Sequence, residues 1–198
     1  VYKRQTGVYK ARDIKAPGVG LKGIVQALDY LTASNRQSFG DSVPEIESGE
    51  LNADGKRVVV IGGGDTAMDC VRTAIRQGAT SVKCLYRRDR ANMPGSQRET
   101  QNAEEEGVEF VWLTAPKGFV GDGAVSGVMV QRMRLGPPDA TGRQMPELIE
   151  GADYVEDADI VITALGFEPE EIPTLWNVPD LEVTRWGTVK ADFRTLSL

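Results

Sequence analysis

The chain has 198 residues, enough for one substantial domain or for one domain and part of a second. Its net charge of −6, from 23 basic and 29 acidic residues, argues against a general nucleic-acid-binding protein. The sequence has no histidine, which excludes Ser-His-Asp and Cys-His catalysis, and its two cysteines form no CxxC or metal-ligand spacing. No apolar run reaches the ~18 residues that span a bilayer, and no signal-peptide pattern is present, so we expect a cytoplasmic protein.

The first predicted elements are a helix and a linker. From Ile24 onward, apolar residues recur at positions i, i+3, i+4 and i+7, so residues 23–33 are predicted to form one amphipathic helix. Residues 34–55 are rich in Ser, Asn, Gly and acidic side chains and are expected to be a linker. The chain starts at Val1 and stops directly after a strand-like stretch, so we expect an internal fragment of a longer protein.

Strands and helices then alternate at short spacing. Residues 58–61 are a continuous β-branched run, which is typical of a strand buried on both faces of a parallel sheet. The following elements are predicted to be a helix over 65–77, a strand over 81–86, a helix over 96–106 and a strand over 108–113. This order predicts an α/β, Rossmann-like fold with a parallel sheet and right-handed helical crossovers.

The pattern changes after the third strand. Residues 117–120 and 124–135 are predicted to form a hairpin around a Gly-Asp-Gly turn, with residues 147–150 as a third antiparallel strand. Residues 159–164 return to a short apolar strand. We therefore expect an antiparallel β-meander inserted between the parallel strands.

A glycine-rich turn carries the strongest functional signal. The run from Gly62 to Ala67 has the pattern GxGxxA and lies between a predicted strand and a predicted helix. There Gly62 permits a tight turn, Gly64 lets a pyrophosphate approach the backbone, and Ala67 lets the helix pack near the strand. The alternative is a glycine-rich turn that binds no ligand. Asp65, the first residue of this helix, either caps the free N–H groups of its own helix or contacts a cofactor directly.

The end of the second strand predicts which dinucleotide is bound. A site for NAD places an acidic residue about 20 residues after the glycines, where it accepts a hydrogen bond from the ribose. Here Arg87 and Arg88 occupy that place, and Asp89 comes later. Because a guanidinium group suits a 2′-phosphate, we predict NADP(H) rather than NAD(H). The alternative is a solvated basic loop.

Ala164 and Gly166 follow the last apolar strand. Small residues at the carboxyl end of a parallel strand border a dinucleotide site, and an ordinary turn is the alternative. Cys70 and Cys84 are predicted to be core residues. We find no nucleophile paired with a base, as expected for hydride transfer, in which cofactors supply the chemistry.

Three sequence runs together resemble a known family. GGGDTAMDC, YRRDRANMPG and ALGFEP are similar to the small (β) subunit of NADPH-dependent glutamate synthase, and the similarity extends from about Thr6 to Thr195. The resemblance implies that the 2′-phosphate of NADPH is held by Arg87 and Arg88, and that Ala164 and Gly166 border the cofactor. It also implies a pyrophosphate site at Gly62, Gly63, Gly64, Asp65, Thr66 and Ala67.

In that family an NADPH-binding domain splits an FAD domain in sequence. NADPH reduces FAD, and electrons pass through 4Fe-4S clusters to the large (α) subunit, which forms glutamate. The resemblance thus implies a remnant of the FAD domain with a helix and linker over residues 1–55, the NADPH-binding domain over 56–170, and the start of the return to the FAD domain over 171–198. Thr6 and Gly7 resemble the point where the FAD domain hands over.

The sequence lacks the family's cluster cysteines and its first FAD glycine motif. The chain is therefore expected to bind NADPH, but not to hold FAD or clusters and not to turn over alone. The same residues are also compatible with two other functions. One is the equivalent domain of another electron-transfer flavoprotein, such as a ferredoxin–NADP reductase subunit or dihydropyrimidine dehydrogenase. The other is a non-catalytic nucleotide-sensing module.

Overall fold

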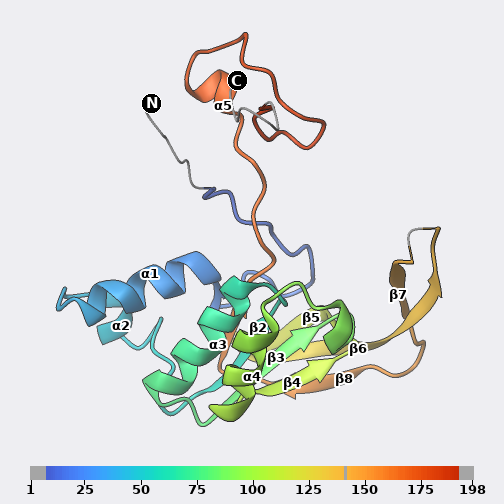
Figure 1. Cartoon of the computed structure of the whole chain (residues 1–198). Coiled ribbons are helices and arrows are strands. Elements are labelled where there is room, and N and C mark those ends of the chain that lie inside the picture. Colours follow the sequence, from blue (N-terminus) through green and yellow to red (C-terminus); the bar gives the residue numbers. More distant parts are fainter. Residues whose placement is uncertain (1–7, 141, 192–198) are drawn as a thin grey trace. The chain divides into compact units, whose positions relative to one another are not determined.

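The computed structural model of the chain describes residues 8–140 and 142–191. Its helices are α1 (Ala27–Ser38), α2 (Pro44–Glu47), α3 (Asp65–Gln77), α4 (Gln97–Glu105) and α5 (Ile172–Leu175), with a short 3-10 helix, η1 (Arg90–Asn92). Its strands are β1 (Ile24–Gln26), β2 (Arg57–Ile61), β3 (Ser81–Tyr86), β4 (Glu109–Trp112), β5 (Thr114–Asp122), β6 (Ala124–Pro138), β7 (Gln144–Leu148), β8 (Tyr154–Asp157) and β9 (Ile160–Thr163). Figure 1 shows these elements along the chain.

The larger of two compact units, Asp13–Gly166, is built on a five-stranded sheet in the order β1-β9-β2-β3-β4. All neighbouring strands in this sheet are parallel. β2 lies at its centre, with Val59 opposite Val161 on one side and Lys83 on the other. The predicted buried strand and the predicted parallel sheet are therefore confirmed.

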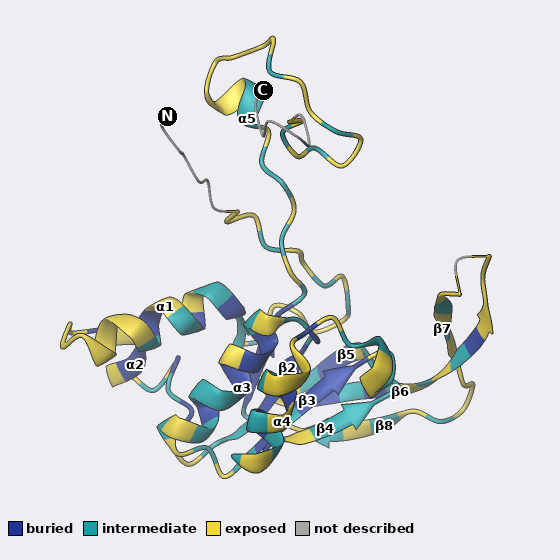
Figure 2. Ribbon diagram, in the orientation of Figure 1, coloured by how far each residue is buried: buried dark blue, intermediate teal, exposed yellow. Residues whose placement is uncertain are grey.

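Alternate side chains of β2 enter two different apolar cores. Val58 and Val60 pack with residues of α1, α3 and α4, whereas Val59 and Ile61 pack with residues of β5 and β6. Helices thus cover one face of the parallel sheet and antiparallel strands cover the other, and the inner strands are buried in Figure 2. This two-sided burial explains why β2 is a continuous apolar run rather than an alternating one.

The antiparallel layer contains the predicted meander. β5 and β6 form a hairpin, β7 pairs with the far part of β6, and β8 pairs with its near part. The prediction of an α/β fold with an inserted β-meander is confirmed. β8 was not expected from the sequence, because its one aliphatic side chain, Val155, is flanked by polar residues and is exposed.

The prediction of one helix over residues 23–33 is wrong at its start. Residues Ile24–Gln26 form β1, which pairs in parallel with β9, and the helix begins only at Ala27. The two β-branched residues Ile24 and Val25 extend the sheet at its free edge. Pairing with a strand far away in sequence overrides the local helical spacing.

The prediction of a linker over residues 34–55 is also wrong. α1 continues to Ser38, α2 follows, and four apolar side chains of the segment are buried in the helical core. Their spacing follows a short helix and turns rather than a regular period, so periodicity alone does not detect them. The buried residues are Val43, Ile46, Leu51 and Ala53.

The smaller unit is described over residues 8–12 and 167–191. Ala11 and Phe167 form an isolated antiparallel bridge, and the Glu168 N–H donates to the Lys10 carbonyl at 2.8 Å. The Lys10 ammonium lies 2.9 Å from the Glu168 carboxylate, an exposed pair. The segments before and after the larger unit therefore pair with each other.

The larger unit begins and ends at other positions than the predicted domain, residues 56–170. Residues 13–55 belong to it, because β1 joins its sheet and α1 packs on α3. The assignment of 1–55 and 171–198 to an FAD domain stays a prediction. Thr6, Gly7 and Thr195, which mark the family resemblance, lie outside the described residues.

Arg57 and Asp159 hold the beginnings of β2 and β9 together. The guanidinium group donates to both carboxylate oxygens at 2.8 and 3.0 Å, and the Arg57 N–H adds a bond of 2.9 Å. These bonds lower the pKa of Asp159 from 3.8 to about 2. A carboxylate whose pKa is lowered by folding stabilises the fold at pH values above its pKa in the unfolded state. This stabilisation is lost as the pH falls toward its pKa in the folded state.

We therefore expect the free energy of unfolding to fall between about pH 4 and pH 2, in part because of Asp159. Asp159→Asn should lower stability at pH 7 by about 1 kcal/mol, after allowance for solvent screening of these partly exposed groups, and should flatten the acid slope. Urea titrations from pH 7 to pH 2 measure both. A slope equal to that of the unsubstituted protein would contradict this role, and Arg57→Met should reproduce the flattening.

Candidate functional site

The predicted site residues come together at the carboxyl ends of three adjacent strands. The glycine turn follows β2, Arg87 and Arg88 follow β3, and Ala164 to Gly166 follow β9. The chain order of the strands reverses between β2 and β9, and open α/β sheets bind ligands outside such a reversal. The sheet therefore places all three predicted sets at the edge where a dinucleotide binds in this type of fold.

Gly62 packs directly against the end of β9. A Cβ at this position would lie 2.2 Å from the Ala164 carbonyl oxygen, and the φ angle of +147° is one that L side chains rarely adopt. The Ala164 N–H donates to the Ile61 carbonyl at 2.8 Å, which holds the two strand ends together. The tight turn expected at Gly62 thus requires glycine because of this close approach.

Gly63 and Gly64 have different surroundings. A Cβ at Gly63 would lie 2.5 Å from the ring of Tyr86, a residue that the sequence analysis did not select. At Gly64, apart from its chain neighbours, no atom of the described residues lies within 4 Å of an added Cβ. The first two glycines are therefore required by the protein itself, whereas Gly64 borders open space.

The first turn of α3 has free hydrogen-bond donors. The Gly64 carbonyl accepts the N–H groups of Ala67 and Met68, and Ala67 is fully buried against the sheet. In the described part of the chain, the N–H groups of Gly64, Asp65 and Thr66 have no acceptor. Free amides and the positive end of the helix dipole form a site that favours an anion.

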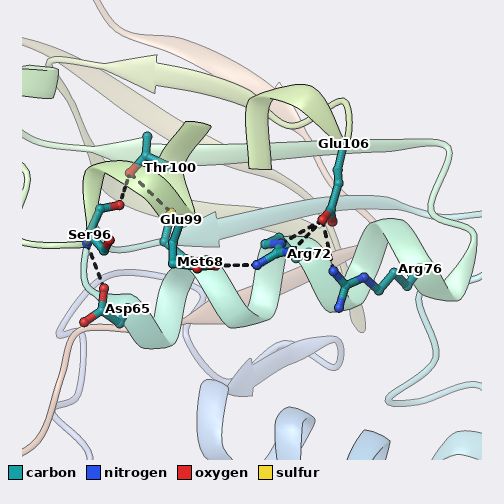
Figure 3. A network of polar contacts seen from close by, with 8 residues as sticks. All are labelled: Asp65, Met68, Arg72, Arg76, Ser96, Glu99, Thr100 and Glu106. Carbon is teal, nitrogen blue, oxygen red and sulfur yellow. Dashed lines mark hydrogen bonds and ion pairs between the residues drawn. The ribbon is translucent and has the colours of Figure 1, made fainter. Parts of the chain in front are cut away.

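Asp65 does not cap its own helix, so that alternative is wrong. No side-chain cap is present at the start of α3, and the Asp65 Oδ1 accepts the N–H of Ser96 at 2.8 Å (Figure 3). The preceding residue, Gly95, donates its N–H to the Gly63 carbonyl at 2.8 Å. Gly95 and Ser96 were not predicted as site residues, although the Met-Pro-Gly-Ser turn before a helix is a signal for such a contact.

The two arginines after β3 differ in exposure. Arg87 is exposed and Arg88 is half-buried, and neither forms an ion pair within the described residues. The Nε of Arg88 is buried and has no hydrogen-bond partner there. Arg90, in contrast, lies 2.6 Å from Glu104. An unpartnered guanidinium beside an anion site is the feature expected where a second phosphate binds.

The two cysteines belong to the helical core of the larger unit. Cys70 and Cys84 are both free and buried. Burial raises the pKa of Cys84 to about 12 and raises that of Cys70 as well, so both thiols are protonated at neutral pH. Their prediction as core residues is confirmed. No helix of the described residues has the length and apolar character needed to cross a bilayer.

The profile of the family described as pyridine nucleotide-disulphide oxidoreductase matches residues 6–195. The chain belongs to this family. A glutamate synthase (NADPH) small chain from Azospirillum brasilense is 68% identical over 190 residues, which are 96% of this chain and 39% of that protein. A Cereibacter sphaeroides protein that is named provisionally as the same small chain is 79% identical over 190 residues, or 96% of this chain and 45% of that protein.

The chain thus spans less than half the length of these curated relatives. Among solved structures, Mycobacterium tuberculosis FprA in complex with NADPH matches with a TM-score of 0.67 and 18% identity, over 84% of this chain and 50% of that one. At this identity the match supports the fold of the family and not a shared substrate.

We expect Gly62→Ala to destabilise the protein by more than about 2 kcal/mol, because the added methyl group meets the Ala164 carbonyl and the φ angle is strained. Urea denaturation followed by circular dichroism measures the change. Gly64→Ser is the matched control. Its side chain enters open space and Ser is a favoured N-cap residue, so stability should change by less than about 0.5 kcal/mol. Equal effects of the two substitutions would contradict the proposed difference between the glycines.

Proposed function

We propose that the chain is the NADPH-binding domain of an FAD-dependent oxidoreductase of the glutamate synthase small-subunit type. The observation that carries this proposal is the presence of two groups of free hydrogen-bond donors at adjacent strand ends. The free amides at the start of α3 lie next to Gly64, and the unpartnered Arg87 and Arg88 follow the neighbouring strand.

The residues present fit NADPH. The open space at Gly64 and the free N–H groups of Gly64, Asp65 and Thr66 are suited to its pyrophosphate. Gly62, Gly63 and Ala67 allow the close packing that presents these amides, and they have no side chain that would fill the space. Together they would form the cofactor's diphosphate site.

The two arginines after β3 would recognise the adenosine ribose. Arg87 and Arg88 would donate to the 2′-phosphate, and no acidic residue directly follows β3 to accept from an unmodified ribose. Ala164 and Gly166 would border the cofactor on the β9 side, where the strand order reverses. Bound NADPH supplies the hydride, and the protein supplies position and charge.

In the whole protein we propose that FAD accepts the hydride and that 4Fe-4S clusters carry electrons to a large (α) subunit that forms glutamate. The 68% identity to a glutamate synthase small chain supports this reading. The pairing of residues 9–11 with 167–170 supports an NADPH-binding domain inserted into another domain. We propose a cytoplasmic protein with no membrane or nucleic-acid partner.

We expect Gly64→Val to weaken NADPH binding by more than about tenfold, the effect of losing one hydrogen bond to a charged group, because the side chain fills the diphosphate space. The substitution should leave the fold intact, since nothing in the described protein opposes it. Isothermal titration calorimetry with NADPH measures the loss. Gly20→Val, at another glycine with open space around it, is the control and should bind normally. Undiminished NADPH binding by Gly64→Val would refute the site.

The arginines give a separate test of cofactor choice. Arg88→Gln should weaken NADPH about tenfold to a hundredfold and NADH by less than about twofold, because only NADPH has the 2′-phosphate. Arg90→Gln is the control, since Arg90 is paired with Glu104, and it should leave both affinities unchanged. Calorimetric titration of each variant with each nucleotide decides the matter. Equal losses for NADPH and NADH would remove the assignment.

A further inference from the structure

The loop between β3 and α4 returns to the glycine turn. We name residues 87–96 the arginine loop, because Arg87 and Arg88 form its first part. Two hydrogen bonds join its last part to the turn: Gly95 N–H to the Gly63 carbonyl and Ser96 N–H to the Asp65 Oδ1, both 2.8 Å long. Figure 3 shows the second bond at the start of α3. The loop therefore connects the two features to which we assign phosphate binding.

Asp65 is an unfavourable residue beside a diphosphate unless it has another task. Its carboxylate is exposed and carries a negative charge next to amides that we assign to an anion. Like charges repel each other. The helix dipole favours an acid in the first turn, but Asp65 makes no capping hydrogen bond to its own helix. The bond to Ser96 supplies the missing reason for a side-chain acceptor here.

The other contacts of the arginine loop do not replace this bond. Asp89 accepts from the backbone and side chain of Asn92, at 3.0 and 2.7 Å, and the Tyr86 hydroxyl donates to the Asn92 carbonyl at 3.1 Å. These bonds hold the middle of the loop to itself and to β3. The Arg88 carbonyl accepts the N–H of Leu113 at 3.1 Å, which holds the first part of the loop beside the end of β4. The loop is hydrogen-bonded to the glycine turn and to α3 through Gly95 and Ser96.

α4 is attached to α3 independently of Asp65. Arg72 donates to Glu106 at 2.7 and 2.9 Å and also binds Glu99, and Arg76 donates to Glu106 at 3.0 Å (Figure 3). The bonds from Arg72 lower the pKa of Glu106, so this carboxylate is charged at neutral pH. Loss of Asp65 would therefore remove one of the two hydrogen bonds between the arginine loop and the glycine turn without detaching α4.

We propose that Asp65 is a positioning residue that sets the preference for NADPH over NADH. Its carboxylate holds the arginine loop against the glycine turn, and this fixes the position of Arg87 and Arg88 relative to the amides of α3. The 2′-phosphate and the pyrophosphate belong to one nucleotide, so both groups bind well only when the two protein features keep their spacing. The inference rests on the proposed NADPH site.

The test compares Asp65→Ala with Asp65→Asn in the 198-residue chain, by calorimetric titration with NADPH and with NADH. Asp65→Ala should weaken the binding of NADPH about tenfold and that of NADH by less than about twofold, because the arginines that it positions contact only the 2′-phosphate of NADPH. Asp65→Asn keeps an acceptor for the Ser96 N–H, so it should retain the preference of the unsubstituted chain. Asp69→Ala removes a carboxylate one turn along α3 and should leave the preference unchanged.

Ser96→Pro removes the donor without substituting Asp65, whose exposed side chain can turn away from the proline ring. The φ angle of Ser96 is −57°, which proline adopts, so this variant should fold. It should reproduce the loss seen with Asp65→Ala, and the double variant should show no further loss. Hydrogen exchange of residues 87–96 should rise in both variants while that of α4 stays unchanged.

The outcomes separate the two proposals. If the unsubstituted chain binds neither nucleotide, the proposed function fails, and the inference fails with it. If it prefers NADPH and Asp65→Ala keeps the full preference, the function stands and the positioning role is overturned. If Asp65→Asn loses the preference as Asp65→Ala does, the charge of Asp65 and not its hydrogen bond sets it, and the inference is overturned in the same way.

Discussion

The arrangement of the site depends on two contacts that only glycine permits. Gly62 lies against the Ala164 carbonyl at the end of β9, and Gly63 lies against the ring of Tyr86 at the end of β3. These contacts seat the turn between its two neighbouring strands. The protein fills the space beside the first two glycines and leaves it open beside Gly64, where the free amides of α3 begin. The sheet therefore holds the unpaired N–H groups at the start of α3 in place, and no side chain fills the space beside Gly64.

The two layers of the larger unit make that rigidity possible. Each inner strand packs against helices on one face and against the antiparallel strands on the other. The carboxyl ends of β9, β2 and β3 therefore stay in register. Close-packed protein interiors resist small displacements. Residues at neighbouring strand ends therefore keep fixed spacings, which a ligand that touches several strand ends requires.

The chemistry available to the chain follows from what is buried and what is left free. Both cysteines are protonated core residues, and the sequence has no histidine, so side chains of this chain offer neither a redox thiol nor an imidazole base. At the candidate site, the unpaired groups of the described residues include the backbone amides at the start of α3 and the guanidinium groups of Arg87 and Arg88. Such a set recognises anions and positions a cofactor, and the reaction itself belongs to that cofactor.

The sequence alone determined what local pattern and spacing can encode. The β-branched run of β2, the bounds of α3 and the place of Arg87 and Arg88 after β3 all follow from contiguous residues. Contacts between distant segments were decided only by the tertiary structure. Residues Ile24–Gln26 form a strand because they pair with the edge of β9. The Asp65 carboxylate accepts the Ser96 N–H because the arginine loop returns to the glycine turn. Neither partner is visible from local periodicity, since each depends on how the chain folds back on itself.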